Sequence, residues 1–339
     1  MNMKKLTLFA LIALVLAGCA GGGTQTARKV PVKGAVSGNS GDVLVVLDKA
    51  EWEGAIGGEL RSFLGCDCPY LAMPEPLFNL KGIQPSEFKD TYLKFRNIIV
   101  YEISPDVENP GISTTKSEWA RTQCKVTVKA HDSGEALALT RSGEQTIIDI
   151  FEKAERDRLI QNTAEFEAKS VTRAMKDRFN GSPHFPDGFK VLKEEERDDL
   201  TFAWVANDKD NWSMIVFMYR FPYVGEEQLT LDEIARKRSE IGREFVPGPV
   251  DNSWMVTSFL YGAREIEIGG RSVIQVRGHW GMENYYMGGP FVSHTFLSRD
   301  SSEVIVLDAM VYGPRYDKLP FVRQLEAILY SWEWKYAIE

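Results

Sequence analysis

Runs of apolar residues and strict alternation mark four strands in the first half of the chain. Val43–Leu47 is continuously apolar and predicts a buried strand, and Ile98–Ile103 predicts a second one. Cys124–Ala130 alternates between small or apolar and polar residues, which predicts a half-buried strand with Cys124 toward the core. Leu77–Leu80 follows a proline-containing stretch and predicts a short edge strand.

Helical spacing appears between and after these strands. Asp48 is expected to cap a helix with Glu51 as its partner, and apolar residues recur at helical spacing from Trp52 to Phe63. Residues 134–179 are predicted to be mostly helical, with a break near Gly143. The charged middle of this region favours a solvated face, and an arm that docks a partner is the alternative.

Strands joined by hairpins dominate the second half. Gly269-Gly270 predicts a tight hairpin, and Pro320 begins the last helix. The other expected elements are a helix capped by Thr230 and strands at residues 202–206, 212–221, 291–297 and 304–311. This pattern predicts an α+β fold, with two mostly antiparallel sheet-plus-helix layers joined by a long helix.

The N-terminus has the pattern of a lipoprotein signal. Lys4 and Lys5 precede the apolar stretch Leu6–Leu16, which is too short to span about 30 Å of hydrocarbon. Leu16-Ala17-Gly18-Cys19 follows, and small residues before a cysteine fit the narrow cleft of a lipoprotein signal peptidase. We therefore expect acyl chains on Cys19 to anchor the mature chain to a membrane. An ordinary secretory signal is the alternative.

Four segments follow from these patterns. Residues 1–18 are predicted as a signal peptide, 19–41 as a lipidated flexible tether, 42–182 as an N-terminal α+β half and 183–339 as a C-terminal α+β half. Neither an acidic run nor an aspartate follows Cys19. These features favour an outer-membrane lipoprotein that faces the periplasm over display on the cell surface or retention in the inner membrane.

The net charge of the mature chain limits its expected binding partners. Removal of residues 1–18 leaves 38 basic and 48 acidic residues, a formal charge of −10, without any block of lysine or arginine. Such a chain is a poor candidate for binding nucleic acid or anionic headgroups. The expected partners are a membrane, through the anchor, and an envelope protein or glycan.

Three cysteines remain when Cys19 is acylated. In an oxidising compartment we expect one disulfide from Cys124 to Cys66 or Cys68, with one thiol left free. A Cys66–Cys68 bridge would close a strained, labile ring and is the functional alternative. A three-thiolate zinc site is disfavoured because no histidine has a suitable local spacing.

Candidate chemistry is sparse. The chain has no G-x-S-x-G, H-E-x-x-H or Walker loop, and its four histidines are scattered, so we assign no catalytic residue, metal or cofactor. Abundant carboxylates leave a glutamate or aspartate pair, and hence an envelope hydrolase, as an alternative function.

The most unusual segment runs from residue 277 to 291. It places aromatic residues among four glycines, where they can grip a ligand or cover the edge of a sheet. Its candidate binding surface comprises Arg277, His279, Trp280, Tyr285 and Tyr286.

Several patches resemble a family of Bacteroidetes lipoproteins, the domain of unknown function 4837. They include Trp52-Glu53-Gly54, Pro74-Glu75-Pro76-Leu77-Phe78, Trp119-Ala120, Pro247-Gly248-Pro249, Arg277-Gly278-His279-Trp280, Met287-Gly288-Gly289-Pro290-Phe291 and Arg323-Gln324-Leu325-Glu326-Ala327-Ile328. The resemblance runs in order over nearly the whole mature chain and implies no activity. The second half is also loosely similar to the PsbP/Mog1-like α/β/α sandwich, a fold of small binding proteins. The main hypothesis is therefore a non-catalytic binding or scaffold lipoprotein of the envelope.

Overall fold

A computed structural model describes residues 33–336. The signal peptide, Cys19 and most of the predicted tether lie outside the described residues. Residues 34–41, the end of that tether, pack against the N-terminal sheet. The Gly34 carbonyl accepts a hydrogen bond from the Arg121 amide, and Ser40 Oγ donates to Glu155 Oε2 over 3.0 Å. The described part of the tether is therefore already folded.

The first sheet has five strands, in the order β2-β1-β3-β5-β4. The strands are β1 (Asp42–Val46), β2 (Asn79–Ile83), β3 (Asn97–Ile103), β4 (Gly111–Lys116) and β5 (Cys124–Ala130). Strands β2, β1, β3 and β5 pair in parallel, and only the β4–β5 pair is antiparallel. The predicted antiparallel arrangement is wrong here, because helical crossovers rather than hairpins lead from β1 to β2.

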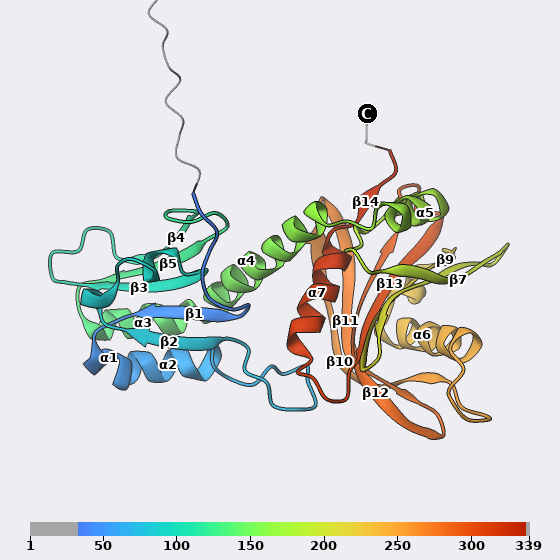
Figure 1. Cartoon of the computed structure of the whole chain (residues 1–339), viewed down its shortest axis with the longest axis horizontal. Helices are drawn as coiled ribbons and strands as arrows, with labels where there is room; N and C mark the ends of the chain where they lie inside the picture. Colours follow the sequence, from blue (N-terminus) through green and yellow to red (C-terminus); the bar gives the residue numbers. More distant parts are fainter. Residues whose placement is uncertain (1–32, 337–339) are drawn as a thin grey trace, which may run out of the picture. The chain divides into compact units, whose positions relative to one another are not determined.

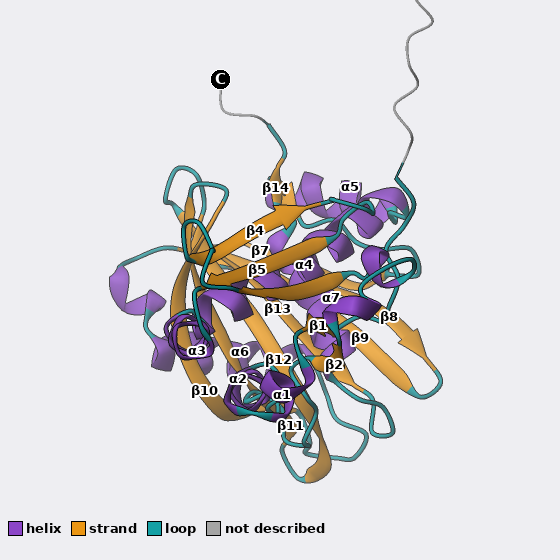
Figure 2. Cartoon of the chain, turned by 90° about the vertical axis from the view of Figure 1, so that its left-hand side faces the viewer, coloured by secondary structure: helices purple, strands orange, loops and turns teal. Residues whose placement is uncertain are grey.

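Helices cover one face of this sheet (Figure 2). They are α1 (Lys49–Glu53), α2 (Ala55–Phe63), α3 (Ser133–Ser142) and α4 (Glu144–Glu165). The opposite face packs against the segment that holds η1 (Pro85–Glu87) and η2 (Tyr92–Lys94). Asp48 is the N-cap residue of α1, as predicted, but its side chain makes no capping hydrogen bond, so the expected capping box is absent.

The second sheet has seven antiparallel strands, in the order β10-β11-β12-β13-β9-β8-β7. The strands are β7 (Lys190–Arg197), β8 (Leu200–Lys209), β9 (Trp212–Pro222), β10 (Met255–Ile268), β11 (Arg271–Met282), β12 (Tyr285–Leu297) and β13 (Glu303–Tyr312). The hairpin predicted at Gly269-Gly270 is present, and both glycines have positive φ. The antiparallel prediction is confirmed for this half.

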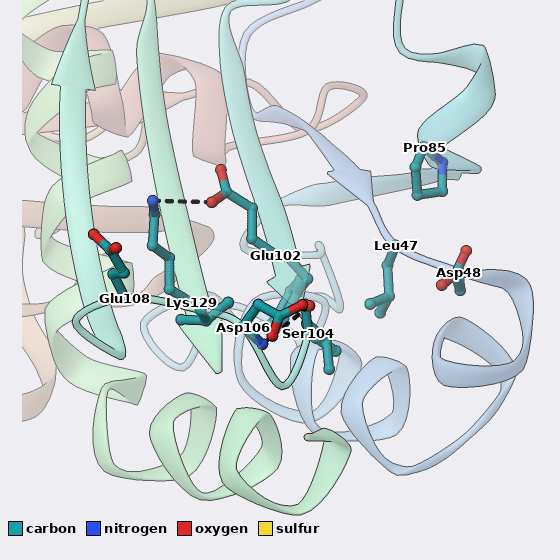
Figure 3. Close-up of a pocket in the computed structure, with 11 residues that line it drawn as sticks. Leu47, Asp48, Pro85, Glu102, Ser104, Asp106, Glu108 and Lys129 are labelled. Atoms are coloured by element: carbon teal, nitrogen blue, oxygen red, sulfur yellow. Dashed lines mark hydrogen bonds and ion pairs between the residues drawn. The ribbon is translucent and has the colours of Figure 1, made fainter. Parts of the chain in front are cut away.

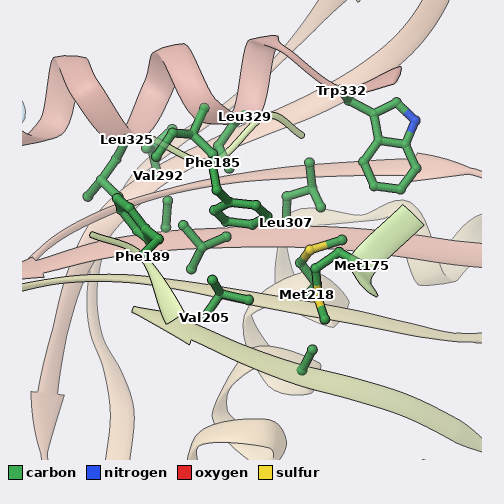
Figure 4. Packing of buried hydrophobic residues seen from close by; sticks show 14 of the residues in the cluster. Met175, Phe185, Phe189, Val205, Met218, Val292, Leu307, Leu325, Leu329 and Trp332 are labelled. Carbon is green, nitrogen blue, oxygen red and sulfur yellow. The ribbon is translucent and has the colours of Figure 1, made fainter. Parts of the chain in front are cut away.

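Helices lie on both faces of the second sheet (Figure 1). Helices α5 (Lys169–Phe179) and α7 (Leu319–Tyr330) cover one face, and α6 (Leu231–Phe245) covers the other, preceded by η3 (Glu226–Leu229). Figure 4 shows Leu325 and Leu329 of α7 above the sheet residues Val292 and Leu307. A short β6 (Gly181–Ser182) pairs with β14 (Glu333–Trp334). These layers confirm the α+β class.

Helix α4 connects the two layers. It contacts both β5 and α7, and its predicted break at Gly143 is present. Its buried Glu155 accepts hydrogen bonds from Arg96 and Asn97 of the first sheet region and from Arg158 one turn along the helix. Burial alone would raise the pKa of Glu155, but the guanidinium groups of Arg158 and Arg96 lower it to about 2. No helix among the described residues is long and apolar enough to cross a membrane.

The cysteines of the described chain carry free thiols. Cys124 points into the core, as predicted, but it forms no disulfide with Cys66 or Cys68, so the predicted bridge is absent. Burial raises the pKa of Cys68 and of Cys124 to about 11, which keeps both thiols protonated and unreactive.

Thiol counting tests this assignment. Mature protein prepared without reductant should show three reactive thiols in denaturant if acylation occupies Cys19. The folded protein should react mainly at the half-buried Cys66, because the other two thiols are buried with raised pKa values. A single thiol in denaturant would instead reveal a disulfide.

Candidate functional site

A cavity in the described range 33–336 opens at the carboxyl ends of the parallel strands. We name it the switch-point cleft. Its volume is about 520 Å³, and it is lined by Leu47, Asp48, Pro85, Tyr101, Glu102, Ile103, Ser104, Asp106, Val107, Glu108 and Lys129. Figure 3 shows its side chains around the ends of neighbouring strands.

The strand order explains this position. The chain leaves β1 toward β2 on one side and later returns to place β3 on the other side of β1. The connections also lie on opposite faces, because α1 and α2 cover one face while the η1–η2 segment covers the other. Connections that diverge in this way leave a crevice between β1 and β3, where open α/β sheets bind ligands.

The cleft is negatively charged. Asp48, Glu102, Asp106 and Glu108 are exposed carboxylates, and Lys129 is the one basic residue in the lining. Lys129 Nζ lies 3.0 Å from Glu102 Oε2, which leaves three carboxylates without a cation in the lining (Figure 3). Leu47, Pro85, Ile103 and Val107 add an apolar floor beside these charges.

The carboxylates of the switch-point cleft lack the desolvated environment of a hydrolytic carboxylate pair. The carboxylates of the cleft are exposed, whereas a general acid needs a desolvated site to hold its proton near neutral pH. The buried carboxylates are bound to cations or amides instead. Asp42 pairs with Lys81, Glu155 with Arg96 and Arg158, Asp308 with Arg238 and Glu326 with Arg277, while Glu75 accepts from the amides of Lys318 and Leu319.

The residues predicted as a binding surface divide between the two faces of a hairpin. The segment 277–291 is not a wide loop, because β11 and β12 continue through it to a turn at residues 283–284. Arg277 and His279 face the side of α7, while Trp280 lies on the opposite face in the core against α6. Tyr285 and Tyr286 lie beyond the turn and are exposed. The five residues therefore do not form one surface.

Trp280 is a core residue rather than a ligand contact. Only 2% of its surface is exposed, and its indole N–H donates to the Val311 carbonyl over 3.3 Å. Gly289 makes room for this bond, since a Cβ there would lie 2.2 Å from the Val311 oxygen and 3.1 Å from Trp280 Nε1. The glycines of this segment thus allow close strand packing around a large ring.

Arg277 lines a second hollow that the sequence did not predict, and His279 packs beside it against Tyr261. This arginine pocket has a volume of about 180 Å³ and is lined by Tyr70, Tyr261, Gly262, Ala263, Arg264, Gln275 and Arg277. The ring of His279 packs edge-on against Tyr261, with centroids 5.4 Å apart. Burial lowers the pKa of His279, so this histidine is neutral near pH 7.

The two hollows lie in segments of the chain that match different protein families. Residues 168–331 match a family described as a domain of unknown function, DUF4837. The C-terminal half is thus similar to this family. Residues 36–164 match a different domain of unknown function, DUF8532. The family predicted from the sequence is thus confirmed, but its extent is narrower than expected. The switch-point cleft lies wholly in the DUF8532 domain, and six of the seven residues of the arginine pocket lie in the DUF4837 domain.

The N-terminal motif is also matched. Residues 3–20 match a prokaryotic membrane lipoprotein lipid attachment site, which includes Cys19. The chain is therefore a membrane-anchored lipoprotein of the cell envelope.

Solved structures show only distant likeness. A Mycobacterium tuberculosis protein, LpqN, described as involved in cell envelope biogenesis, is 12% identical with a TM-score of 0.28, over 44% of this chain and 78% of LpqN. The Pseudomonas aeruginosa protein PA94, described as of unknown function and a putative regulator, is 13% identical with a TM-score of 0.22, over 39% of this chain and 76% of its own. No curated protein sequence matches the chain.

Proposed function

We propose that this lipoprotein is a non-catalytic binding protein of the envelope whose switch-point cleft receives a ligand with a positively charged group. The observation that carries the proposal is the position of this cavity at the β1/β3 switch point. The exposed Asp48, Asp106 and Glu108 supply an excess of negative charge, and the apolar floor accommodates the carbon skeleton that carries the cation.

Binding of a small basic probe tests this function. We expect trilysine to bind the detergent-solubilised mature lipoprotein in isothermal titration calorimetry, and triglutamate not to bind. The double variant Asp106→Asn/Glu108→Gln should bind trilysine about tenfold more weakly, because each exposed carboxylate contributes roughly 0.5–1 kcal/mol to the free energy of binding. The affinity should also fall with added salt, since these charges are exposed and screened.

A matched variant controls for net charge. Glu226→Gln removes an exposed carboxylate from η3, in the other family domain, and should leave trilysine affinity unchanged. Equal binding to the double variant, or no trilysine binding to the unmodified protein, would contradict the proposed cleft.

We propose that the protein resides in the outer membrane and faces the periplasm. This proposal rests on the lipid attachment site and on the absence of an aspartate directly after Cys19. Separation of the two membranes by density should place the protein in the outer-membrane fraction. Protease added to intact cells should leave it uncut, and digestion there would indicate display on the cell surface.

A further inference from the structure

The arginine pocket concentrates positive charge in an acidic protein. Arg156, Arg264, Arg271 and Arg277 all lie near enough to the buried His294 to reduce its pKa further, beyond the larger effect of its burial. Within residues 33–336, only Arg277 of these four forms an ion pair with a carboxylate, that of Glu326. Arg156 and Arg271 instead lie over the rings of Tyr330 and Phe296. This face of the second sheet therefore carries a local excess of positive charge.

Two of these guanidinium groups retain hydrogen-bond donors at the pocket. Arg264 donates from Nε to Gln275 Oε1 over 2.9 Å, and Arg277 donates from Nη2 to Glu326. Their other N–H groups have no hydrogen-bond partner in the described range 33–336. Only 1% of the surface of Gln275 is exposed, and its Nε2 lies within hydrogen-bond distance of His294 Nε2, at 3.0 Å. Because Gln275 is held in this way, its Oε1 keeps the Arg264 guanidinium in place. Planar groups held in this way suit a carboxylate, which can accept two parallel N–H bonds.

Aromatic rings form the walls beside these donors. Tyr70 and Tyr261 stand nearly perpendicular, at 79° with centroids 6.4 Å apart, and Arg277 packs 4.3 Å from the Tyr70 ring. Tyr261 keeps 39% of its surface exposed and is flanked by Phe259, itself 54% exposed. The exposed ring of Tyr261 offers an apolar face to a saccharide ring, while its hydroxyl lies 3.4 Å from His279 Nε2. The volume of about 180 Å³ is below the roughly 300 Å³ of pockets for drug-sized ligands and suits one ring.

We infer that the arginine pocket binds an acidic sugar, with its carboxylate on Arg264 and Arg277 and its ring against Tyr261. This site is separate from the switch-point cleft in its residues, its charge and its family domain, so it goes beyond the proposed function. It predicts that one protein carries a cation-binding hollow in one domain and an anion-binding hollow in the other.

Glucuronate serves as the probe, with glucose as its neutral counterpart and inorganic phosphate as a bare anion. By ligand-observed NMR with the solubilised mature lipoprotein, we expect glucuronate to bind at least about tenfold more tightly than glucose. Arg264→Gln should remove that preference, whereas Arg173→Gln, an exposed arginine on α5, should not change it. Tyr261→Ala should weaken glucuronate but leave phosphate binding unchanged.

These measurements test the anion site and the sugar site separately. Equal affinity for glucuronate and glucose, no glucuronate binding, or an unchanged preference in Arg264→Gln would overturn the site. Phosphate that binds as tightly as glucuronate, with no effect of Tyr261→Ala on either, would show a bare anion site and overturn the sugar assignment. Tyr261→Ala should keep the melting temperature of the unmodified protein, because the Tyr261 side chain is exposed. Arg264→Gln removes the donor to the buried Gln275 Oε1, so its melting temperature is measured and its binding is compared at a temperature at which both proteins are folded. Trilysine binding, measured in parallel, reports on the switch-point cleft independently.

Discussion

Trp280→Ala should lower the free energy of unfolding by about 3–5 kcal/mol. The ring is 2% exposed, lies in the core between the second sheet and α6, and would leave both a cavity and an unpaired Val311 carbonyl. Urea unfolding followed by circular dichroism measures the loss. Trp280→Phe should cost less, because it keeps an aromatic ring in the core and loses mainly the hydrogen bond.

Tyr286→Ala is the matched control for that experiment. Tyr286 belongs to the same hairpin and the same predicted surface, but its side chain is fully exposed. Its removal should change the free energy of unfolding by less than about 0.5 kcal/mol. Equal, small effects of both substitutions would contradict the core assignment of Trp280.

Acid should destabilise the protein through Glu155. The folded pKa of about 2 lies below the value of 4.5 for an unperturbed glutamate, so the carboxylate stabilises the fold above pH 4.5. That contribution, about 3 kcal/mol for a shift of this size, is lost as the pH falls from 4.5 toward 2. Denaturant titrations across this pH range should show the decline.

Glu155→Gln separates this carboxylate from the general effect of acid. The change leaves Arg96 and Arg158 buried beside a neutral group and should cost about 3–5 kcal/mol at pH 7. The variant should also lose much of the steepness of the decline below pH 4.5. Glu165→Gln, an exposed glutamate on the same helix, should match the unmodified protein at every pH. A parallel decline in the Glu155 variant would exclude Glu155 as its cause.

Strands and helices were predictable where periodicity is local. The apolar run Val43–Leu47 and the alternation at Cys124–Ala130 correspond to β1 and β5. Strand direction was harder, because parallel and antiparallel strands differ in what connects them rather than in their own residues. The helical spacing between Trp52 and Phe63 was the available signal for a parallel crossover. With that direction known, Asp48 and Ser104, the first polar residues after two buried strands, would have marked one edge of the sheet.

The predicted binding surface was wrong because side chains alternate between the two faces of a strand. Neighbouring residues of a strand point to opposite faces, so His279 and Trp280 cannot share a surface once the segment is a strand. The disulfide failed for another reason. Cys68 and Cys124 are both buried in the same core, yet whether two buried thiols meet depends on tertiary distances that spacing along the chain does not determine. Tyr70 and Arg264 likewise meet only through tertiary packing.

The Glu75 carboxylate also limits how this protein could have been assembled from parts. It lies in the DUF8532 domain, and it accepts hydrogen bonds from the Lys318 and Leu319 amides at the start of α7, a helix of the DUF4837 domain, over 2.6 and 2.7 Å. Arg323 of α7 in turn donates to the Leu77 carbonyl. A DUF4837 domain transplanted behind a different partner would keep its helix but lose the acceptor for its first amides. We therefore expect residues 168–331 to be less stable behind an unrelated domain than in this chain, because the Lys318 and Leu319 amides would lose their carboxylate acceptor.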